Sequence, residues 1–138
     1  MLLRSQKGIT LTEILIVSVI LAVLATLATP SYFRTLEQSR SNEAKAKLQA
    51  IHFGEKIYKE NNGKFYPTGG GTITDVTVIN TNLNTDVMDA SDDYYDISVT
   101  TAAGTAATAY TATASRNNGS SKTFTIDQTG TITEGGSY

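Results

Sequence analysis

The sequence predicts an α+β fold in which one long N-terminal α-helix packs against a small antiparallel β-sheet. Three observations lead to this prediction. Residues 9–29 form an apolar run that continues into a stretch rich in helix-forming residues. In the last third of the chain, apolar and polar residues alternate with a period of two. The segment between these two regions is rich in Gly, Thr and Asn, which is typical of a loop.

This interpretation divides the chain into five segments. They are a short basic N-terminal segment at residues 1–8, a membrane-spanning helix at 9–30, an amphipathic helical stem at 31–60, a connecting loop at 61–93 and an antiparallel β-sheet head at 94–138. A length of 138 residues is enough for one domain and one membrane segment. We expect the two helical segments to form one continuous helix of about 52 residues, or about 80 Å.

The composition excludes several classes of function. A net charge of −2 does not indicate a nucleic-acid-binding protein, although residues 34–64 are net basic and residues 65–138 net acidic. The absence of cysteine excludes disulfides and a thiol nucleophile. Gly69-Gly70-Gly71 lacks the Lys-Ser/Thr pair of a phosphate-binding loop. The sequence therefore indicates neither an enzyme nor a cofactor.

The apolar run at residues 9–29 is 21 residues long and contains one charged residue, Glu13. That length can cross a bilayer core of about 30 Å as a helix. Arg4 and Lys7 precede it, and such positive charge keeps the N-terminus in the cytoplasm. A carboxylate in such a segment costs roughly 2.5–3.5 kcal/mol on insertion scales, so we expect Glu13 to have a partner.

The sequence KGITLTE at residues 7–13 resembles the class III signal of type IV pilins and pseudopilins. That signal is a basic leader ending in Gly, an apolar first mature residue and Glu at the fifth mature position. Here Ile9 stands where Phe is usual. The resemblance implies cleavage between Gly8 and Ile9 by a prepilin peptidase, followed by N-methylation of Ile9. It also implies that Glu13 of one subunit pairs with the new Ile9 amine of its neighbour in a filament.

Pro30 would be the twenty-second mature residue, where these proteins often carry proline. It has no backbone donor for the carbonyl oxygen of Thr26, so we expect it to kink or loosen the helix. The resemblance implies that this loosening accompanies subunit assembly.

The stem has two apolar stripes on nearly opposite sides of the predicted helix. One contains Ala44, Leu48, Ile51 and Tyr58, and the other contains Ala46, Ala50, Phe53 and Ile57. A helix on the surface of a soluble domain needs one such face, so two faces predict two partners, the sheet of the same chain and neighbouring subunits. A flank between the stripes is expected to be solvated, and it contains Lys45, His52, Lys56 and Lys59.

The head is expected to be a sheet of three or four antiparallel strands. Asn61-Asn62-Gly63 predicts the end of the helix, and short strand pieces are expected near residues 73–79. Asn117-Asn118-Gly119 and Gln128-Thr129-Gly130 predict two hairpin turns. Ala112 and Ala114 would face the helix and allow it to approach closely. Residues 58–67 also resemble the stretch that ends the long helix in many pilins and pseudopilins, and residues 94–130 resemble the final strands of type IVa pilins.

Three further groups are candidate sites, and each has a simpler explanation that we favour. An acidic cluster could hold calcium but fits a solvated loop better, and it contains Asp86, Asp89, Asp92, Asp93 and Asp96. His52 is the only histidine and is expected to be solvated rather than a metal ligand. Asn118-Gly119-Ser120 matches a glycosylation acceptor but fits a hairpin turn.

The resemblance implies a structural subunit of a type IV pilus, with adhesion, motility and DNA uptake as the possible roles of that pilus. It would wait in the inner membrane as a single-span protein and then enter an extracellular helical homopolymer with the help of a platform protein and an assembly ATPase. The alternatives are the major pseudopilin of a type II secretion system and a monomeric membrane-anchored binding module.

Overall fold

A computed structural model describes residues 8–87, 94–102, 107–117 and 121–137 of the chain. It confirms the predicted α+β architecture of a long helix and an antiparallel sheet. The chain divides into two units, Met1–Ser39 and Arg40–Tyr138, and helix α1 (Leu11–Asn62) contributes to both.

Helix α1 has 52 residues and continues without interruption through Pro30. It ends as the sequence predicted, because Gly63 adopts the left-handed conformation with φ of 73°. The amide nitrogen of Gly63 donates a hydrogen bond of 2.7 Å to the carbonyl oxygen of Lys59, which satisfies one of the last carbonyl groups of the helix.

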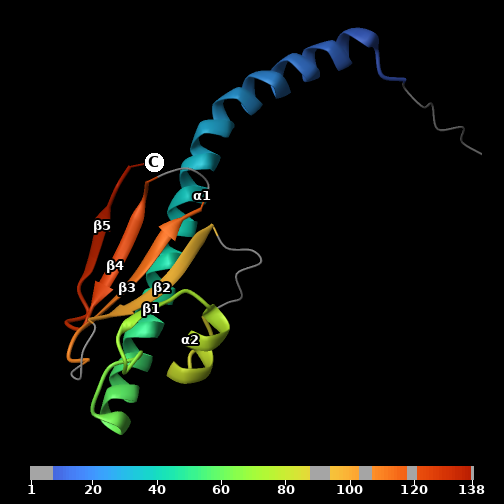
Figure 1. The fold of residues 1–138 in the computed structure, drawn as a ribbon. Helices are drawn as coiled ribbons and strands as arrows, with labels where there is room; N and C mark the ends of the chain where they lie inside the picture. The colour runs from blue at the N-terminus through green and yellow to red at the C-terminus, as the bar shows by residue number, and fades with distance from the viewer. Residues whose placement is uncertain (1–7, 88–93, 103–106, 118–120, 138) are drawn as a thin grey trace, which may run out of the picture. The chain divides into compact units, whose positions relative to one another are not determined.

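The sheet is an antiparallel meander in which neighbours in sequence are neighbours in space, and Figure 1 shows the strands side by side in this order. Its strands are β1 (Gly71–Ile73), β2 (Tyr95–Thr101), β3 (Tyr110–Arg116), β4 (Thr123–Asp127) and β5 (Ile132–Gly135). The prediction of three or four strands was wrong, since there are five in the described part of the chain. The edge strand β1 is only three residues long, and its pairing with β2, in which Ile73 lies opposite Val99, cannot be deduced from so short an alternation.

The core lies between one face of the sheet and one stripe of α1. Leu48 and Ile51 of α1 are fully buried, as are Ala112 and Ala114 of β3, and all belong to one apolar cluster. The two alanines carry small side chains, so the helix can lie close to the middle of the sheet. The predicted inward stripe of α1 and the predicted inward positions of β3 are therefore confirmed.

The segment that the sequence predicted to be a loop with short strand pieces near residues 73–79 contains a second helix, α2 (Val76–Leu83), so the strand prediction was wrong for residues 76–79. The side chain of Asp75 caps it by accepting hydrogen bonds from the amides of Thr77 and Val78. Val76, Ile79 and Leu83 recur at helical spacing and are buried. The prediction missed α2 because its Val, Thr and Asn residues are poor helix formers, so that packing and the cap decide its structure.

Helix α1 carries a glycine where the C-terminal end of α2 lies against it. A Cβ atom on Gly54 would lie 2.8 Å from the carbonyl oxygen of Leu83 and 2.7 Å from Cγ2 of Thr85. Glycine inside a helix costs about 1 kcal/mol relative to alanine. Here it allows the backbone of the 83–85 segment to pack directly on α1.

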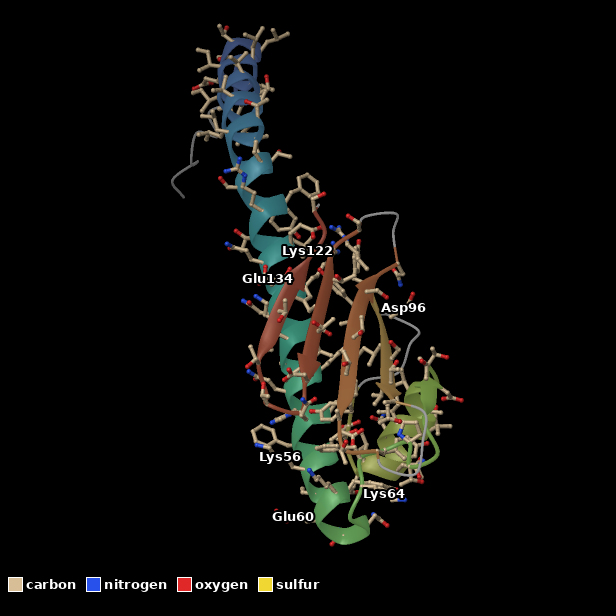
Figure 2. All side chains as sticks on the ribbon, turned by 60° about the vertical axis from the view of Figure 1, so that its left-hand side comes forward. Lys56, Glu60, Lys64, Asp96, Lys122 and Glu134 are labelled. Atoms are coloured by element: carbon tan, nitrogen blue, oxygen red, sulfur yellow. The ribbon has the colours of Figure 1, made fainter. Side chains whose placement is uncertain are left out.

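The last strand is tied to α1 by charged side chains. Glu134 of β5 accepts hydrogen bonds from Lys45 of α1 and from Lys122, whose Nζ lies 3.2 Å from Oε2. Figure 2 shows Lys122 and Glu134 close together at this edge of the sheet. Both lysines also lie over the ring of Phe124. Exposed ion pairs are individually worth about 0–1 kcal/mol, so this cluster positions β5 more than it stabilises the core.

Leu48→Ala should lower the free energy of unfolding of the head by about 2–5 kcal/mol, because it leaves a cavity between α1 and the sheet. Phe53→Ala, on the exposed side of the same helix, should change it by no more than about 0.5 kcal/mol. Denaturant unfolding of the full chain in detergent micelles, followed by near-UV circular dichroism, measures both values. Equal losses in the two variants would contradict this assignment of the helix faces.

Candidate functional site

The first described residues form a short non-helical segment before α1. Gly8, Ile9 and Thr10 are exposed, and the side chain of Ile9 is 74% exposed. No atom lies within 4 Å of the place where a Cβ would stand on Gly8. The peptide bond between Gly8 and Ile9 is therefore accessible and outside the helix, which is the geometry that a peptidase requires. Cleavage there and methylation of Ile9 remain predictions.

Glu13 has a partner within its own chain. Its Oε2 accepts hydrogen bonds from the amide nitrogen and the hydroxyl of Thr10, at 2.8 and 2.9 Å. The amide of Glu13 donates in return to Oγ1 of Thr10 at 3.3 Å. This reciprocal pattern is a capping box, which satisfies free amides at a helix N-terminus. Sequence reasoning did not single out Thr10, although the spacing Thr-x-x-Glu is the signature of that motif.

The N-terminal part of α1 presents a continuous apolar surface. The large apolar side chains between Leu11 and Leu27 are 53–84% exposed within the chain. By length and composition the helix could cross a membrane. Its most apolar stretch has a mean hydropathy of 2.5, and none of the described residues in that stretch is buried. The hydroxyls of Ser18 and Thr26 donate to the backbone carbonyls of Leu15 and Val23, so they need no partner outside the helix.

Pro30 lies within the helical part of α1, in the Met1–Ser39 unit. The hydroxyl of Thr29 beside it donates to the carbonyl oxygen of Ala25 at 2.8 Å. A role for Pro30 in assembly remains a prediction, as does the role of Glu13 between subunits.

The second apolar stripe of the stem is largely uncovered. Phe53 and Ile57 are 62% and 58% exposed, and Ala46 is also exposed. A shallow hollow of about 250 Å³ lies beside this stripe, lined by Ala46 and Ala50 with Glu43, Lys47 and Asp86 around them. Within the described ranges, one of the two apolar stripes of the stem is therefore buried and most of the other is exposed.

His52 does not lie in solvent, so that prediction was wrong. Its side chain is 6% exposed, and its Nδ1 lies 2.6 Å from the hydroxyl of Tyr110 on β3. Burial lowers the pKa of His52, and the nearby charge of Lys56 lowers it further, while Asp127 acts in the opposite direction. The turn that follows β4 covers the ring, since a Cβ on Gly130 would lie 2.9 Å from Nε2 of His52. The helical-wheel assignment failed because this turn reaches over the flank of the helix.

Glu55 is a buried residue that sequence reasoning missed. It is 0% exposed, and its Oε2 accepts a hydrogen bond of 2.9 Å from the amide of Tyr66. Burial raises the pKa of Glu55 to about 7, although the Tyr66 amide acts in the opposite direction. Its position three residues after His52 places both polar groups on the sheet-facing side of α1. Nothing in the sequence pattern distinguishes Glu55 from an exposed helix glutamate.

The remaining candidates of the head are only partly described. Asp86 and Asp96 are exposed, whereas Asp89, Asp92 and Asp93 lie outside the described residues. Within the described ranges no group of three His, Cys, Asp or Glu side chains could hold a metal ion. The acceptor pattern Asn118-Gly119-Ser120 and its hairpin turn also lie outside these ranges, whereas the turn at Gln128-Thr129-Gly130 is confirmed.

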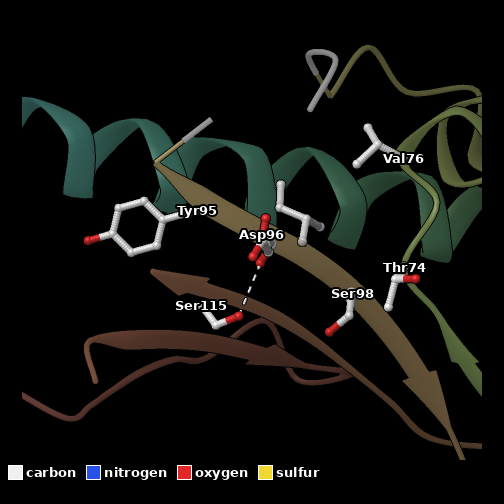
Figure 3. A pocket seen from close by; sticks show the side chains of 7 residues that line it. Thr74, Val76, Tyr95, Asp96, Ser98 and Ser115 are labelled. Atoms are coloured by element: carbon white, nitrogen blue, oxygen red, sulfur yellow. Dashed lines mark hydrogen bonds between the residues drawn. The ribbon is translucent and has the colours of Figure 1, made fainter. Parts of the chain in front are cut away.

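The outer face of β2 and β3 carries a polar hollow of about 310 Å³, shown in Figure 3. Asp96, Ser98 and Ser115 lie on it, with Thr74 and Val76 at its side. The hydroxyl of Ser115 donates to the backbone carbonyl oxygen of Asp96 at 3.5 Å. This is a shallow, hydroxyl-rich surface with a single carboxylate rather than a catalytic constellation.

The described chain thus combines an exposed apolar helical segment, which has a glutamate in its first turn, with a small antiparallel sheet. Comparison with known proteins adds a match at the N-terminus. Residues 3–29 match the family described as the prokaryotic N-terminal methylation motif.

Similarity to individual proteins points in the same direction. The chain is 38% identical to the type II secretion system core protein G of Dickeya chrysanthemi over 65 residues, which are 47% of this chain and 42% of that protein. It is 37% identical to core protein G of Pseudomonas aeruginosa over 68 residues, 49% of this chain and 48% of that protein. It is 34% identical to the type IV major pilin protein PilA of Myxococcus xanthus over 53 residues, 38% of this chain and 24% of that protein.

The chain spans less than half the length of these relatives. No solved structure matches it. The chain therefore carries an N-terminal methylation motif and is similar, over part of its length, to type II secretion pseudopilins and to a type IV pilin.

Gly130→Ala should destabilise the head more than Gly63→Ala. Both glycines have a positive φ, of 83° and 73°, so each alanine carries a backbone strain of about 1–2 kcal/mol. Only the Cβ at residue 130 meets His52, whereas nothing lies within 4 Å at residue 63. The difference between the two losses in unfolding free energy, measured by thermal denaturation, should be about 1 kcal/mol or more. Equal losses would show that the turn does not lie against His52.

Proposed function

We propose that the chain is a structural subunit of a helical filament of the type IV pilin class. The observation that carries this proposal is the apolar surface between Leu11 and Leu27, whose large side chains are exposed within the described part of the chain. Such a surface requires either lipid or another apolar surface around it. A single-span membrane state and a state packed against helices of other copies meet this requirement in turn.

The N-terminal geometry supports processing before assembly. The accessible bond between Gly8 and Ile9 would be cut by a prepilin peptidase, and Ile9 would then carry the new amine and its methyl group. Glu13 is four residues from that amine and within an apolar surface. A cationic amine of a neighbouring copy would compensate its charge, and a pair of this kind can fix the register between subunits.

Apolar burial would supply most of the binding energy between subunits. Each 100 Å² of apolar surface removed from its surroundings is worth about 2.5 kcal/mol relative to water. Leaving lipid gives less, because lipid is itself apolar, so packing and the pairing of Glu13 gain importance in the transfer from membrane to filament. The open stripe of the stem, with Phe53 and Ile57, would extend the contact beyond the membrane segment.

Our first candidate is a surface pilus, with the chain as its main subunit. A platform protein and an assembly ATPase would move the subunit from the inner membrane into the fibre, and the sheet would form the outer surface used in adhesion, motility or DNA uptake. The second candidate is the major pseudopilin of a type II secretion system. The similarity to core protein G in two species favours it.

Deleting the gene and examining sheared surface material by electron microscopy separates these candidates. A pilus subunit predicts long fibres that disappear in the deletion strain while secretion of exoproteins continues. A pseudopilin predicts lost secretion and unchanged surface fibres. A monomeric anchored module predicts neither defect, and mass spectrometry would then find residues 1–8 still attached.

Glu13→Ala should prevent filament formation while membrane insertion continues. Removing one partner of a buried charge pair costs about 3–5 kcal/mol, so subunit association should weaken at least about a hundredfold. Ser18→Ala is the matched control, because its hydroxyl bonds within the helix and needs no partner. Shear yield measures assembly, and membrane fractionation measures insertion. Normal filaments from the Glu13 variant would refute the pairing.

Phe53→Ser should reduce filament yield without lowering the stability of the isolated chain. Truncating a large side chain at an interface typically costs 1 kcal/mol or more, so the association constant should fall by about tenfold. Lys56→Ser, at a neighbouring exposed position of α1, is the control and should leave the yield unchanged. The same fall in both variants would indicate a general loss of stem structure rather than of a contact.

A further inference from the structure

The interior of the head contains a carboxyl group without a charge partner. Glu55 is 0% exposed and lies on the side of α1 that faces the sheet, near the fully buried Ile51. Its Oε2 accepts from the amide of Tyr66, while its Oε1 has no hydrogen-bond partner among the described residues. A buried carboxylate needs several hydrogen bonds or a cation to remain ionised without a large cost.

The groups around Glu55 do not supply a cation. On α1 itself, the Nδ1 of His52 is hydrogen-bonded to the hydroxyl of Tyr110, and the Nζ of Lys59 lies 4.3 Å from the ring centre of Phe65. The loop contributes Tyr66, and β3 contributes Tyr110, both of which are neutral phenols near neutral pH. In the described part of the chain, no ion pair reaches Glu55.

The remaining charged groups of this region lie on its outside. Lys56 is exposed on α1, and Asp127 lies at the end of β4, where both act on His52. Figure 2 shows Lys56, Glu60 and Lys64 at the C-terminal end of α1. A negative charge on Glu55 would therefore be screened only weakly.

The segment that Glu55 holds is itself part of the core. The amide of Phe65 donates to the carbonyl oxygen of Ala107 at 2.9 Å, and the ring of Phe65 packs 4.9 Å from that of Tyr110. Tyr66 packs edge to face against Tyr58 of α1. The bond from Tyr66 to Glu55 is thus one of a small number of links that fix residues 63–67 between the helix and the sheet.

We propose that Glu55 is a proton-binding site that closes the 63–67 segment onto α1 when protonated and loosens it when ionised. This inference concerns only the Arg40–Tyr138 unit and does not depend on the filament function. Its ligand is a proton, and its effect is a change in how firmly Phe65 and Tyr66 are held.

The direction of the effect follows from the pKa of Glu55, which burial raises from 4.5 to about 7. At a pH below the ordinary pKa that Glu55 has in the open state, protonation of Glu55 stabilises the closed segment fully. That contribution is lost as the pH rises toward and through about 7. Between about pH 4.5 and about pH 7 the opening equilibrium should increase about tenfold per pH unit, and it should level off above that range.

Two measurements on the full chain in detergent micelles test the proposal. The first follows the side-chain carboxyl carbon of Glu55 by NMR through a pH titration, with Glu60, exposed on the same helix, observed in the same sample. A midpoint for Glu55 near neutrality supports the proposal. A midpoint close to 4.5 for Glu55 overturns it, and this result does not require any variant to fold.

The second measurement is hydrogen exchange at the amide of Tyr66, corrected for the intrinsic pH dependence of exchange. In the unmodified chain the opening equilibrium should increase about tenfold per pH unit up to neutrality. In Glu55→Gln it should be independent of pH, because the amide side chain still accepts from Tyr66 and cannot ionise. Glu60→Gln should behave like the unmodified chain. The same pH dependence in Glu55→Gln as in the unmodified chain would assign the opening to another group.

Discussion

Helix α1 carries a large apolar surface that is exposed in the described part of the chain, and most features of the molecule follow from this exposure. The stripe around Leu48 and Ile51 is buried by the sheet, whereas the surface between Leu11 and Leu27 is exposed throughout. Monomeric soluble proteins rarely expose an apolar surface as large and continuous as this one. The Arg40–Tyr138 unit thus has its own apolar core, whereas the surface between Leu11 and Leu27 would, in our proposal, be surrounded by lipid or by other copies.

The head compensates for its small size by packing α1 closely on the sheet. Ala112 and Ala114 allow the helix to approach β3, and Gly54 allows the end of α2 to approach the helix. This close packing also encloses polar groups. His52 is satisfied by Tyr110, while Glu55 retains an oxygen without a partner. The interior therefore combines a well-packed apolar layer with a buried carboxyl group that is only partly hydrogen-bonded among the described residues.

The sequence predicted the parts of the fold whose signals are local and repeated. The length and end of α1, the inward stripe of the stem and the inward alanines of β3 all rest on periodicity or on a glycine stop. Helix α2 and strand β1 could not be found in this way. The first is short and made of poor helix formers, and the second is only three residues long. Their structures depend on partners that are distant in sequence.

The candidate site shows the same division. The motif at residues 7–13 is local, and the sequence alone predicts processing at Gly8 and Ile9 and an assembly role for Glu13, which remain predictions. The burial of His52 and Glu55 depends on a turn and a loop that reach the helix from elsewhere, so a helical wheel cannot reveal it. Thr10 is an intermediate case. Its spacing to Glu13 is a local capping-box signal, but the sequence reasoning considered Glu13 only as a charge in an apolar segment.

In our proposal, the capping box would lower the cost of placing Glu13 in a membrane before it meets a neighbouring subunit. Thr10 donates two hydrogen bonds to its Oε2, and a cap of this type is worth about 1 kcal/mol. That is less than the roughly 2.5–3.5 kcal/mol by which a carboxylate disfavours a membrane interior. The cap reduces the cost without removing it, so a cationic partner would still bind favourably. A chain that is tolerated in the membrane as a single copy can in this way retain a driving force for pairing.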